Sequence, residues 1–146
     1  MTAVALHATR GRSIAAVAGG FLVTAVLSTA MDAVMHGTSV FPPMGQAMSD
    51  GLYLWAAAYR AAFTVLGGYV TARLAPRAAL RHAVILAFIG VLAATAGTVA
   101  TWNLGPEFGP KWYPISLIVT ALPCVLAGAW IVTRSDAPTL VAQVKP

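Results

Sequence analysis

Four stretches of about twenty mostly apolar residues, each bounded by helix-breaking sequence, limit what this chain can fold into. They cover residues 14–35, 52–74, 83–102 and 113–133. This length is what a helix needs to cross a hydrocarbon core of about 30 Å. The separators contain Gly, Pro, Ser and clustered Arg, as in "HGTSVFPPMGQAMSDG", "APRAALRH" and "NLGPEFGPK". We therefore predict an all-α polytopic membrane protein, a four-transmembrane-helix bundle that forms a single membrane domain over residues 1–146.

The composition agrees with a membrane protein and argues against a nucleic-acid-binding domain. Hydrophobic residues make up 59% of the 146 residues and charged residues only 9%, whereas a soluble domain carries about 25% charged residues. The net charge is +5, but the cations lie at the ends of the apolar stretches and do not form a basic patch. We expect membrane lipids, and no nucleic acid, among the partners.

The positions of the cations predict the orientation, because loops on the cytoplasmic side are enriched in Lys and Arg. Seven cations fall on one side of the four spans, namely Arg10, Arg12, Arg73, Arg77, Arg81, Arg134 and Lys145. Lys111 lies in a loop on the other side. Both termini are therefore predicted to be cytoplasmic. An alternative is a secretory signal ending at Ala30, but the first apolar stretch is longer than the core of a signal peptide, which favours a span.

Small and polar side chains recur at helical spacing within three of the predicted spans. Transmembrane helices associate through such close-packing faces, so these residues are expected to face the bundle interior. They are Gly20, Thr24, Ser28, Asp32 and His36; Gly67, Gly68 and Thr71; and Gly90, Ala94, Gly97 and Thr101. Small-residue faces of this kind also suit contact with a protein partner or a second copy of the chain.

Arg60 lies well inside an apolar stretch, in "AAAYRAAFTVLGGYVTARLAP". A charge at this depth is costly unless it is paired. Asp32 lies about 8 Å below the outer end of the first span and Arg60 about 13 Å below that of the second, at 1.5 Å per residue. We therefore predict an Asp32–Arg60 ion pair, with Glu107 as the rival acid.

Three further side chains are expected near this pair. His36 lies one helical turn beyond Asp32 on the same face, and Tyr53 and Tyr59 supply hydrogen-bond donors. The candidate polar pocket thus comprises Asp32, His36, Tyr53, Tyr59 and Arg60, and it opens to the outer side. The pair either locks the first two helices together or lines a site for a small anion, a lipid headgroup or a proton.

Motifs for catalysis or metal binding are missing from the sequence. There is no nucleophile elbow, phosphate-binding loop or HExxH motif. His7, His36 and His82 fall at different depths, which does not suit a haem held between two helices, and no two histidines have metal-ligand spacing on one helix. The sequence therefore predicts no catalytic residue, no metal ligand and no cofactor, and we do not expect an enzyme.

Several segments together carry a family resemblance: "FPPMGQAMSDGL", "YRAAFTVLGGYVTARLAP", "RHA" and "TWNLGPEFGPKWYPISLIVTALPC". The chain resembles, from about residue 32 to about residue 128, an uncharacterised family of small four-span bacterial inner-membrane proteins. The resemblance implies a bacterial inner-membrane location and this architecture, and no activity. The leading expectation is an accessory or scaffold subunit that binds a partner. The alternative is a small permease or a lipid- or small-anion-binding protein that uses the Asp32–Arg60 pocket.

Overall fold

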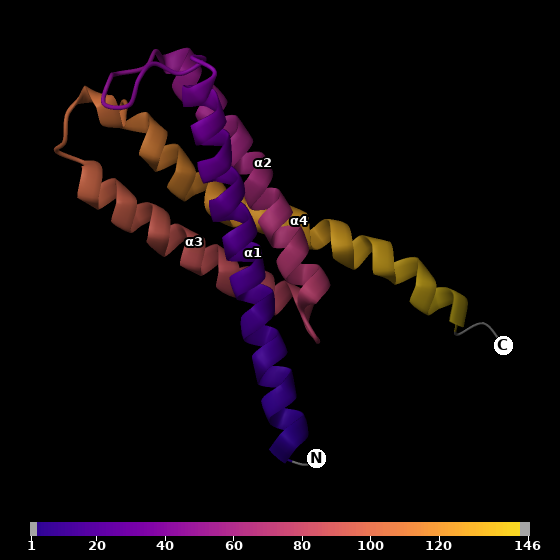
Figure 1. The fold of residues 1–146 in the computed structure, drawn as a ribbon. Coiled ribbons are helices and arrows are strands. Elements are labelled where there is room, and N and C mark those ends of the chain that lie inside the picture. The colour runs from indigo at the N-terminus through magenta and orange to yellow at the C-terminus, as the bar shows by residue number, and fades with distance from the viewer. Residues whose placement is uncertain (1–2, 144–146) are drawn as a thin grey trace.

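The computed structural model describes residues 3–143, with side chains described from residue 10 to residue 135. Within this part the chain forms four long helices and no strand: α1 (Ala3–Gly37), α2 (Asp50–Leu74), α3 (Ala79–Thr101) and α4 (Trp112–Gln143). A short 3-10 helix, η1 (Pro106–Phe108), precedes α4. Consecutive helices run in opposite directions, so that the 38–49 and 102–111 loops lie at one end and the 75–78 turn at the other (Figure 1). The predicted all-α class is confirmed.

The helix bounds differ from the predicted spans mainly at the arginine-rich end. α2 and α3 lie within a few residues of the stretches 52–74 and 83–102. α1, however, begins at Ala3 and α4 continues to Gln143, and both ends project beyond the other helices (Figure 1). An apolar window predicts only the part of a helix that suits a membrane, whereas Ala, Leu and Arg continue the helix past it.

Three helical segments are long and apolar enough to cross a membrane: Arg10–Gly37, Ala79–Thr101 and Pro106–Ser135. This indicates a membrane protein. The prediction of four such helices is wrong, because α2 is long enough but is not apolar enough to be counted with the other three. The physical reason is its content of charged and phenolic side chains, because Arg60 lies mid-helix, Asp50 and Arg73 lie near its ends, and three tyrosines occur between them.

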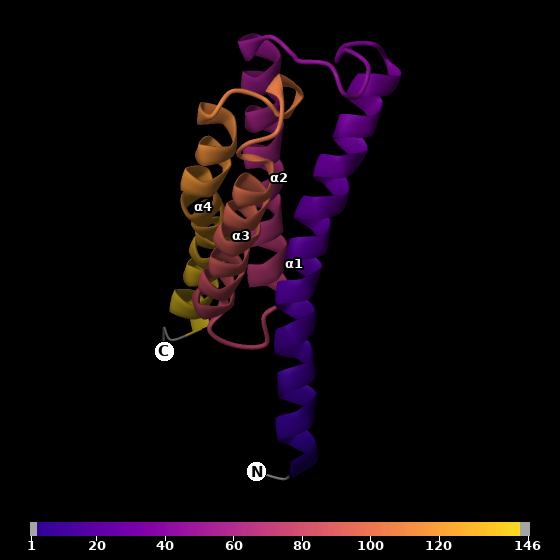
Figure 2. The same cartoon turned by 90° about the vertical axis from the view of Figure 1, so that its left-hand side faces the viewer.

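α2 is the central helix of the bundle. It packs along α4 on one side and along α1 on the other, and α3 packs mainly on α4. α1 contacts α3 much less extensively. In Figure 2, α1 therefore stands apart from α3 and α4 toward the loop end and approaches them at the opposite end.

Glycines allow both helix pairs to approach closely. A Cβ atom on Gly67 of α2 would lie 2.7 Å from the carbonyl oxygen of Gly20 in α1. A Cβ atom on Gly68 would lie 2.2 Å from the carbonyl oxygen of Val125 in α4, and one on Gly128 would lie 1.9 Å from that of Val65. Because these neighbours are backbone atoms, no larger residue fits without moving the helices apart.

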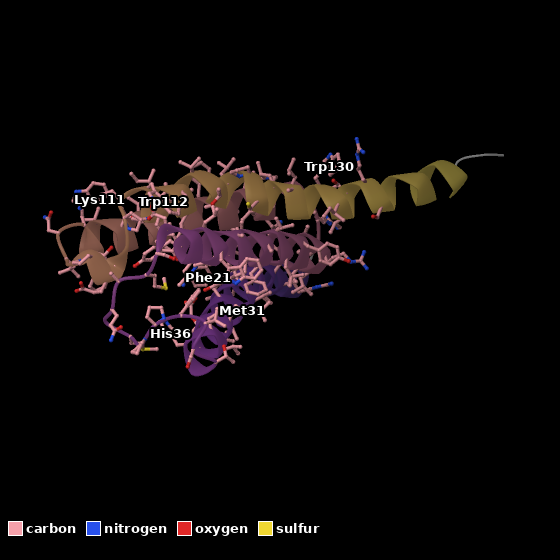
Figure 3. All side chains as sticks on the ribbon, turned by 90° about the horizontal axis from the view of Figure 1, so that it is seen from above. Phe21, Met31, His36, Lys111, Trp112 and Trp130 are labelled. Carbon is pink, nitrogen blue, oxygen red and sulfur yellow. The ribbon has the colours of Figure 1, made fainter. Side chains whose placement is uncertain are left out.

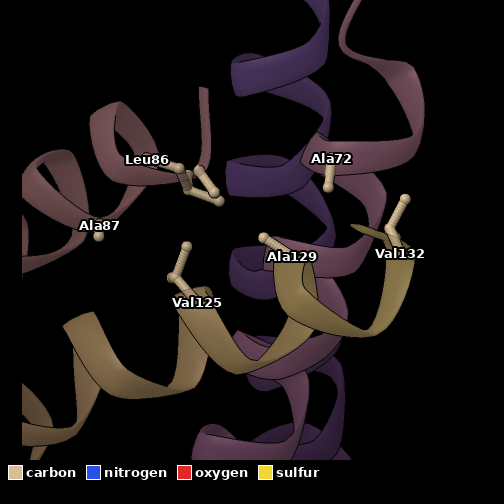
Figure 4. Packing of buried hydrophobic residues seen from close by; sticks show 7 residues of the cluster. Ala72, Leu86, Ala87, Val125, Ala129 and Val132 are labelled. Atoms are coloured by element: carbon tan, nitrogen blue, oxygen red, sulfur yellow. The ribbon is translucent and has the colours of Figure 1, made fainter. Parts of the chain in front are cut away.

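Two apolar clusters fill the space between the helices. The first joins α2, α3 and α4 at the arginine-rich half and consists of small aliphatic side chains (Figure 4): Ala72, Ala83, Leu86, Ala87, Val125, Ala129 and Val132. The second lies at the loop end, where Phe41, Ala56 and Tyr59 pack against methionines of α1 and against Tyr113. Several aromatic residues at this end therefore form core, while Trp55 and Trp102 remain exposed as expected of interfacial residues.

The small-residue faces of α1 and α2 point into the bundle, but that of α3 only partly does. Gly20, Gly67, Gly68 and Thr71 are buried. In α3, Gly90 and Ala94 face the other helices, whereas Gly97 is exposed and a Cβ atom there would meet nothing within 4 Å. The prediction for Gly97 is wrong, because α1 contacts α3 only slightly and leaves the Gly97 side open, whereas the next residue, Thr98, is still buried.

The basic residues gather at the end of the bundle that carries the 75–78 turn. Arg10 and Arg12 lie near the start of α1, Arg73 at the end of α2, and Arg77 and Arg81 at the start of α3. Arg134 lies in the last third of α4, and Lys145 lies outside the described residues. Lys111 is at the opposite end, where it donates a hydrogen bond to the Trp102 carbonyl oxygen and closes the 102–111 loop.

Candidate functional site

Asp32 of α1 and Arg60 of α2 form an ion pair. The Nη2 group of Arg60 donates to Oδ2 of Asp32, and the hydroxyl of Tyr59 donates to Oδ1. Both carboxylate oxygens thus have a donor from α2. The sequence prediction that Asp32, Tyr59 and Arg60 come together agrees with this geometry. The Gly20–Gly67 contact makes it possible, because it holds α1 close to α2 along the face that bears Arg60 two helical turns away.

A tyrosine of α4 completes the surroundings of the guanidinium. Tyr113, in the first turn of α4, interacts with Arg60 and packs on Tyr53 with ring centroids 5.1 Å apart. Tyr113 was not among the predicted site residues. Its position one residue inside the start of α4, at a depth that the long Arg60 side chain can reach, was the signal that could have found it.

A cleft of about 350 Å³ lies between the four helices, and Arg60 forms part of its wall. Asp32 and Tyr59 are not among the lining residues, so of the three side chains in the ion-pair cluster only Arg60 borders the cleft. Five hydroxyl side chains also line it: Thr24, Ser28, Thr29, Thr64 and Thr120. The remaining wall consists of apolar and small residues, such as Leu117 and Gly90.

Three of these five hydroxyl groups donate a hydrogen bond to a backbone carbonyl oxygen of their own helix. Thr64 donates to the Arg60 carbonyl oxygen at 2.7 Å and Thr120 to that of Ser116 at 2.7 Å. Thr24 has two acceptors, the carbonyl oxygens of Gly20 at 3.1 Å and Phe63 at 3.2 Å. Their oxygen lone pairs remain for a donor on a ligand.

One donor of the Arg60 side chain remains without an acceptor from the protein. Among the described residues nothing accepts a hydrogen bond from Nε of Arg60, although this atom is buried. The other buried side-chain atom without a partner in the described part of the chain is the hydroxyl oxygen of Thr71, which does not line this cleft. An unpaired buried donor of this kind costs about 1–3 kcal/mol.

Two predicted site residues lie elsewhere. His36 bonds through Nδ1 to the Pro42 carbonyl oxygen at 2.7 Å and packs edge-on against Phe41, so it fixes the loop after α1. In Figure 3 it lies beside the end of α1, away from the Lys111 and Trp112 end of α4. Including His36 in the pocket is thus not supported by its contacts, because the chain turns back over this side of α1.

Tyr53 supports the 102–111 loop and not the ion pair. Its hydroxyl donates to the Glu107 carbonyl oxygen at 3.2 Å, and its ring covers Gly109. Gly109 has a φ of +93°, and a Cβ atom there would lie 2.7 Å from the tyrosine ring. Glu107 itself is exposed, so it is not the partner of Arg60.

The chain was compared with protein-family models, with curated proteins and with solved structures, and none of the three comparisons finds a match.

Proposed function

We propose that this protein is a non-enzymatic, multi-pass membrane protein that binds a small anionic group in the cleft beside Arg60. The observation that carries the proposal is that Arg60 lines the cleft while its partner Asp32 does not. Paired in this way, the charge is tolerated in a membrane and still presents donors to a ligand.

The depth of the cleft supports a binding role. Its lining residues begin about seven residues from the outer end of α3 and extend to about fifteen, which is roughly 10–22 Å at 1.5 Å per residue. This range covers the middle of a hydrocarbon core of about 30 Å. Substrate sites of small carriers lie at this depth, between helices. Binding of a lipid headgroup or transport of a small anion are both compatible with such a site.

The proposal includes α2 as a fourth span, with both termini in the cytoplasm of a bacterial cell and the chain in the inner membrane. α2 has 25 residues, and its charged mid-helix side chain pairs with α1. Three apolar helices contact it. Its low hydropathy is therefore compensated by its neighbours. The gathering of arginines at the 75–78 end supports the orientation.

The experiment compares ligand-induced stabilisation in two variants of α3. Ala93 lines the cleft, whereas Ala96, one turn away, does not and is exposed. The protein in mild detergent is titrated with inorganic phosphate and with glycerol 3-phosphate, and thermal unfolding is followed. A ligand at 100 times its Kd adds about 2.7 kcal/mol. We expect this stabilisation in the wild type and in Ala96→Phe, and its loss in Ala93→Phe. No stabilisation by either probe, or an equal effect in both variants, refutes the proposal.

The exposed face of α3 supports a second candidate function, that of an accessory or scaffold subunit. Phe88, Leu92 and Val99 are 59%, 68% and 72% exposed and lie on one face of α3. A protein partner or a second copy of the chain would pack on such a face. A native pull-down in mild detergent, with Leu92→Trp as the variant, tests it. Partner capture that Leu92→Trp abolishes supports this function, and capture that is unchanged contradicts it.

A further inference from the structure

A second hollow follows the seam between α1 and α3 at the arginine-rich end. It has a volume of about 460 Å³ and is walled by Ile14, Val17 and Phe21 from α1 and by Ile85 and Ile89 from α3. Ala18 of α1 also lines it, and the walls are almost entirely apolar. Phe21 also borders the Arg60 cleft, so it separates the two hollows. We call this hollow the α1–α3 groove.

The groove has the length of one leaflet. From Ser13 at one end to Phe21 at the other is eight residues of α1, or about 12 Å at 1.5 Å per residue. Half of a hydrocarbon core of about 30 Å is about 15 Å. The bottom of the groove lies among the arginines and its top is near mid-membrane. A surface of this kind, facing the hydrocarbon, is filled by an acyl chain.

The end of the groove near the arginines is polar. Ser13 and His82 line it there, and Arg12 and Arg81 are their immediate neighbours in the sequence. Both arginines are exposed, and within residues 10–135 no carboxylate pairs with either of them. Nδ1 of His82 contacts the Ala78 carbonyl oxygen at 3.2 Å. Because a carbonyl oxygen only accepts, Nδ1 carries the hydrogen and the Nε2 atom remains for another contact.

We propose that the α1–α3 groove binds an anionic phospholipid from the leaflet at the arginine-rich end. One acyl chain lies in the groove from Ser13 up to Phe21, and the headgroup phosphate is bound by Arg12 and Arg81. Charge complementarity selects the lipid class, because guanidinium groups bind phosphate oxygens in pairs and unpaired arginines at a membrane surface attract anionic lipids. This site is separate from the Arg60 cleft and does not depend on the function proposed for it.

The test measures lipid retention by native mass spectrometry of the full chain, extracted from vesicles that contain equal amounts of dioleoyl phosphatidylglycerol and dioleoyl phosphatidylcholine. We expect phosphatidylglycerol to be retained in preference. Ala18→Trp fills the groove and should abolish the retention, whereas Ala15→Trp, on an exposed face of the same helix that does not line the groove, should leave it unchanged. Equal loss in both variants, or in neither, overturns the proposal.

Variants of the exposed arginines keep the test decisive if a tryptophan disturbs folding. Arg12→Gln and Arg81→Gln should each weaken the preference for phosphatidylglycerol about fivefold, and together roughly 25-fold. The control is Arg134→Gln on α4, whose guanidinium stacks on Trp130 at 3.9 Å from the ring centroid. Retention of both lipids to the same extent in the wild type, or the same loss in Arg134→Gln as in Arg81→Gln, refutes the assignment.

Discussion

Replacing Gly128 by Ala should destabilise the protein, although the same change stabilises most helices. In α4, a Cβ atom at this position would lie 1.9 Å from the Val65 carbonyl oxygen and 2.6 Å from the backbone nitrogen of Tyr69. Both atoms belong to the backbone of α2, so no side-chain rotation relieves the overlap. The two helices must move apart, and the buried contacts of Val125 and Ala129 around this crossing loosen with them.

The magnitude follows from a comparison with Gly97→Ala in α3. Gly97 is also within a helix, but a Cβ atom there meets nothing within 4 Å. The gain in helix propensity, about 1 kcal/mol for Gly to Ala, is common to both changes and cancels in their difference. What remains is the steric cost of overpacking, about 1–3 kcal/mol, and the upper end applies because the colliding atoms are backbone.

The assay is reversible unfolding in mixed micelles, with sodium dodecyl sulfate as denaturant and tryptophan fluorescence as the signal. Gly97→Ala should match or exceed the wild type in free energy of unfolding, and Gly128→Ala should fall below Gly97→Ala by the stated amount. Gly68→Ala, which collides with Val125 at the same crossing, should not add its full cost to Gly128→Ala, because one separation of the helices relieves both overlaps. Equal stabilities of Gly128→Ala and Gly97→Ala would refute the close α2–α4 packing.

Three other predictions concern the half of the bundle that carries the 38–49 and 102–111 loops. Arg60→Ala should destabilise the protein, and Asp32→Asn should recover part of this loss in the double variant, with a coupling energy of about 0.5–3 kcal/mol in a double-mutant cycle; additive effects would contradict the pair. Tyr59→Phe should cost about 1.5–3 kcal/mol because it removes a donor to a charged carboxylate, and an unchanged free energy of unfolding would exclude that bond. Tyr53→Phe should cost about 1 kcal/mol and leave phosphate-induced stabilisation in the cleft intact, and loss of that stabilisation would place Tyr53 in the site after all.

The apolar periodicity of the sequence was enough to predict the number of helices and their approximate positions, because a span of about twenty apolar residues has few other uses. It was not enough to predict where α1 begins or where α4 ends. Residues 3–13 are helical although they contain Arg10 and Arg12. A helix can therefore extend beyond its apolar stretch, and hydropathy does not predict where it begins or ends. From the sequence, α2 was ranked with the other three spans, but Arg60, Asp50, Arg73 and three tyrosines make it less apolar than they are.

The ion pair was predictable, whereas the roles of His36 and Tyr53 were not. Asp32 and Arg60 were paired by depth alone, since each charge needs a partner and few are available at that level. The contacts of His36 and Tyr53 are made to the 38–49 and 102–111 loops. How an irregular loop folds back over a helix end depends on features such as the positive φ of Gly109, which periodicity does not reveal.

The close packing of α2 on α1 and α4 produces both the ion pair and the cleft. Gly67 and Gly68 are adjacent, and adjacent residues point about 100° apart on a helix, so α2 contacts α1 with one glycine and α4 with the next. Arg60 precedes Gly67 by two turns and therefore lies on the α1 side, where Asp32 meets it. Because α1 is held by α2 and contacts α3 little, a space remains between the helices, and Arg60 lines it while Asp32 does not. A larger residue in place of Ala93 or Ala94, which also line this space, would fill it without touching the ion pair, so stability and the proposed ligand binding are separable in this fold.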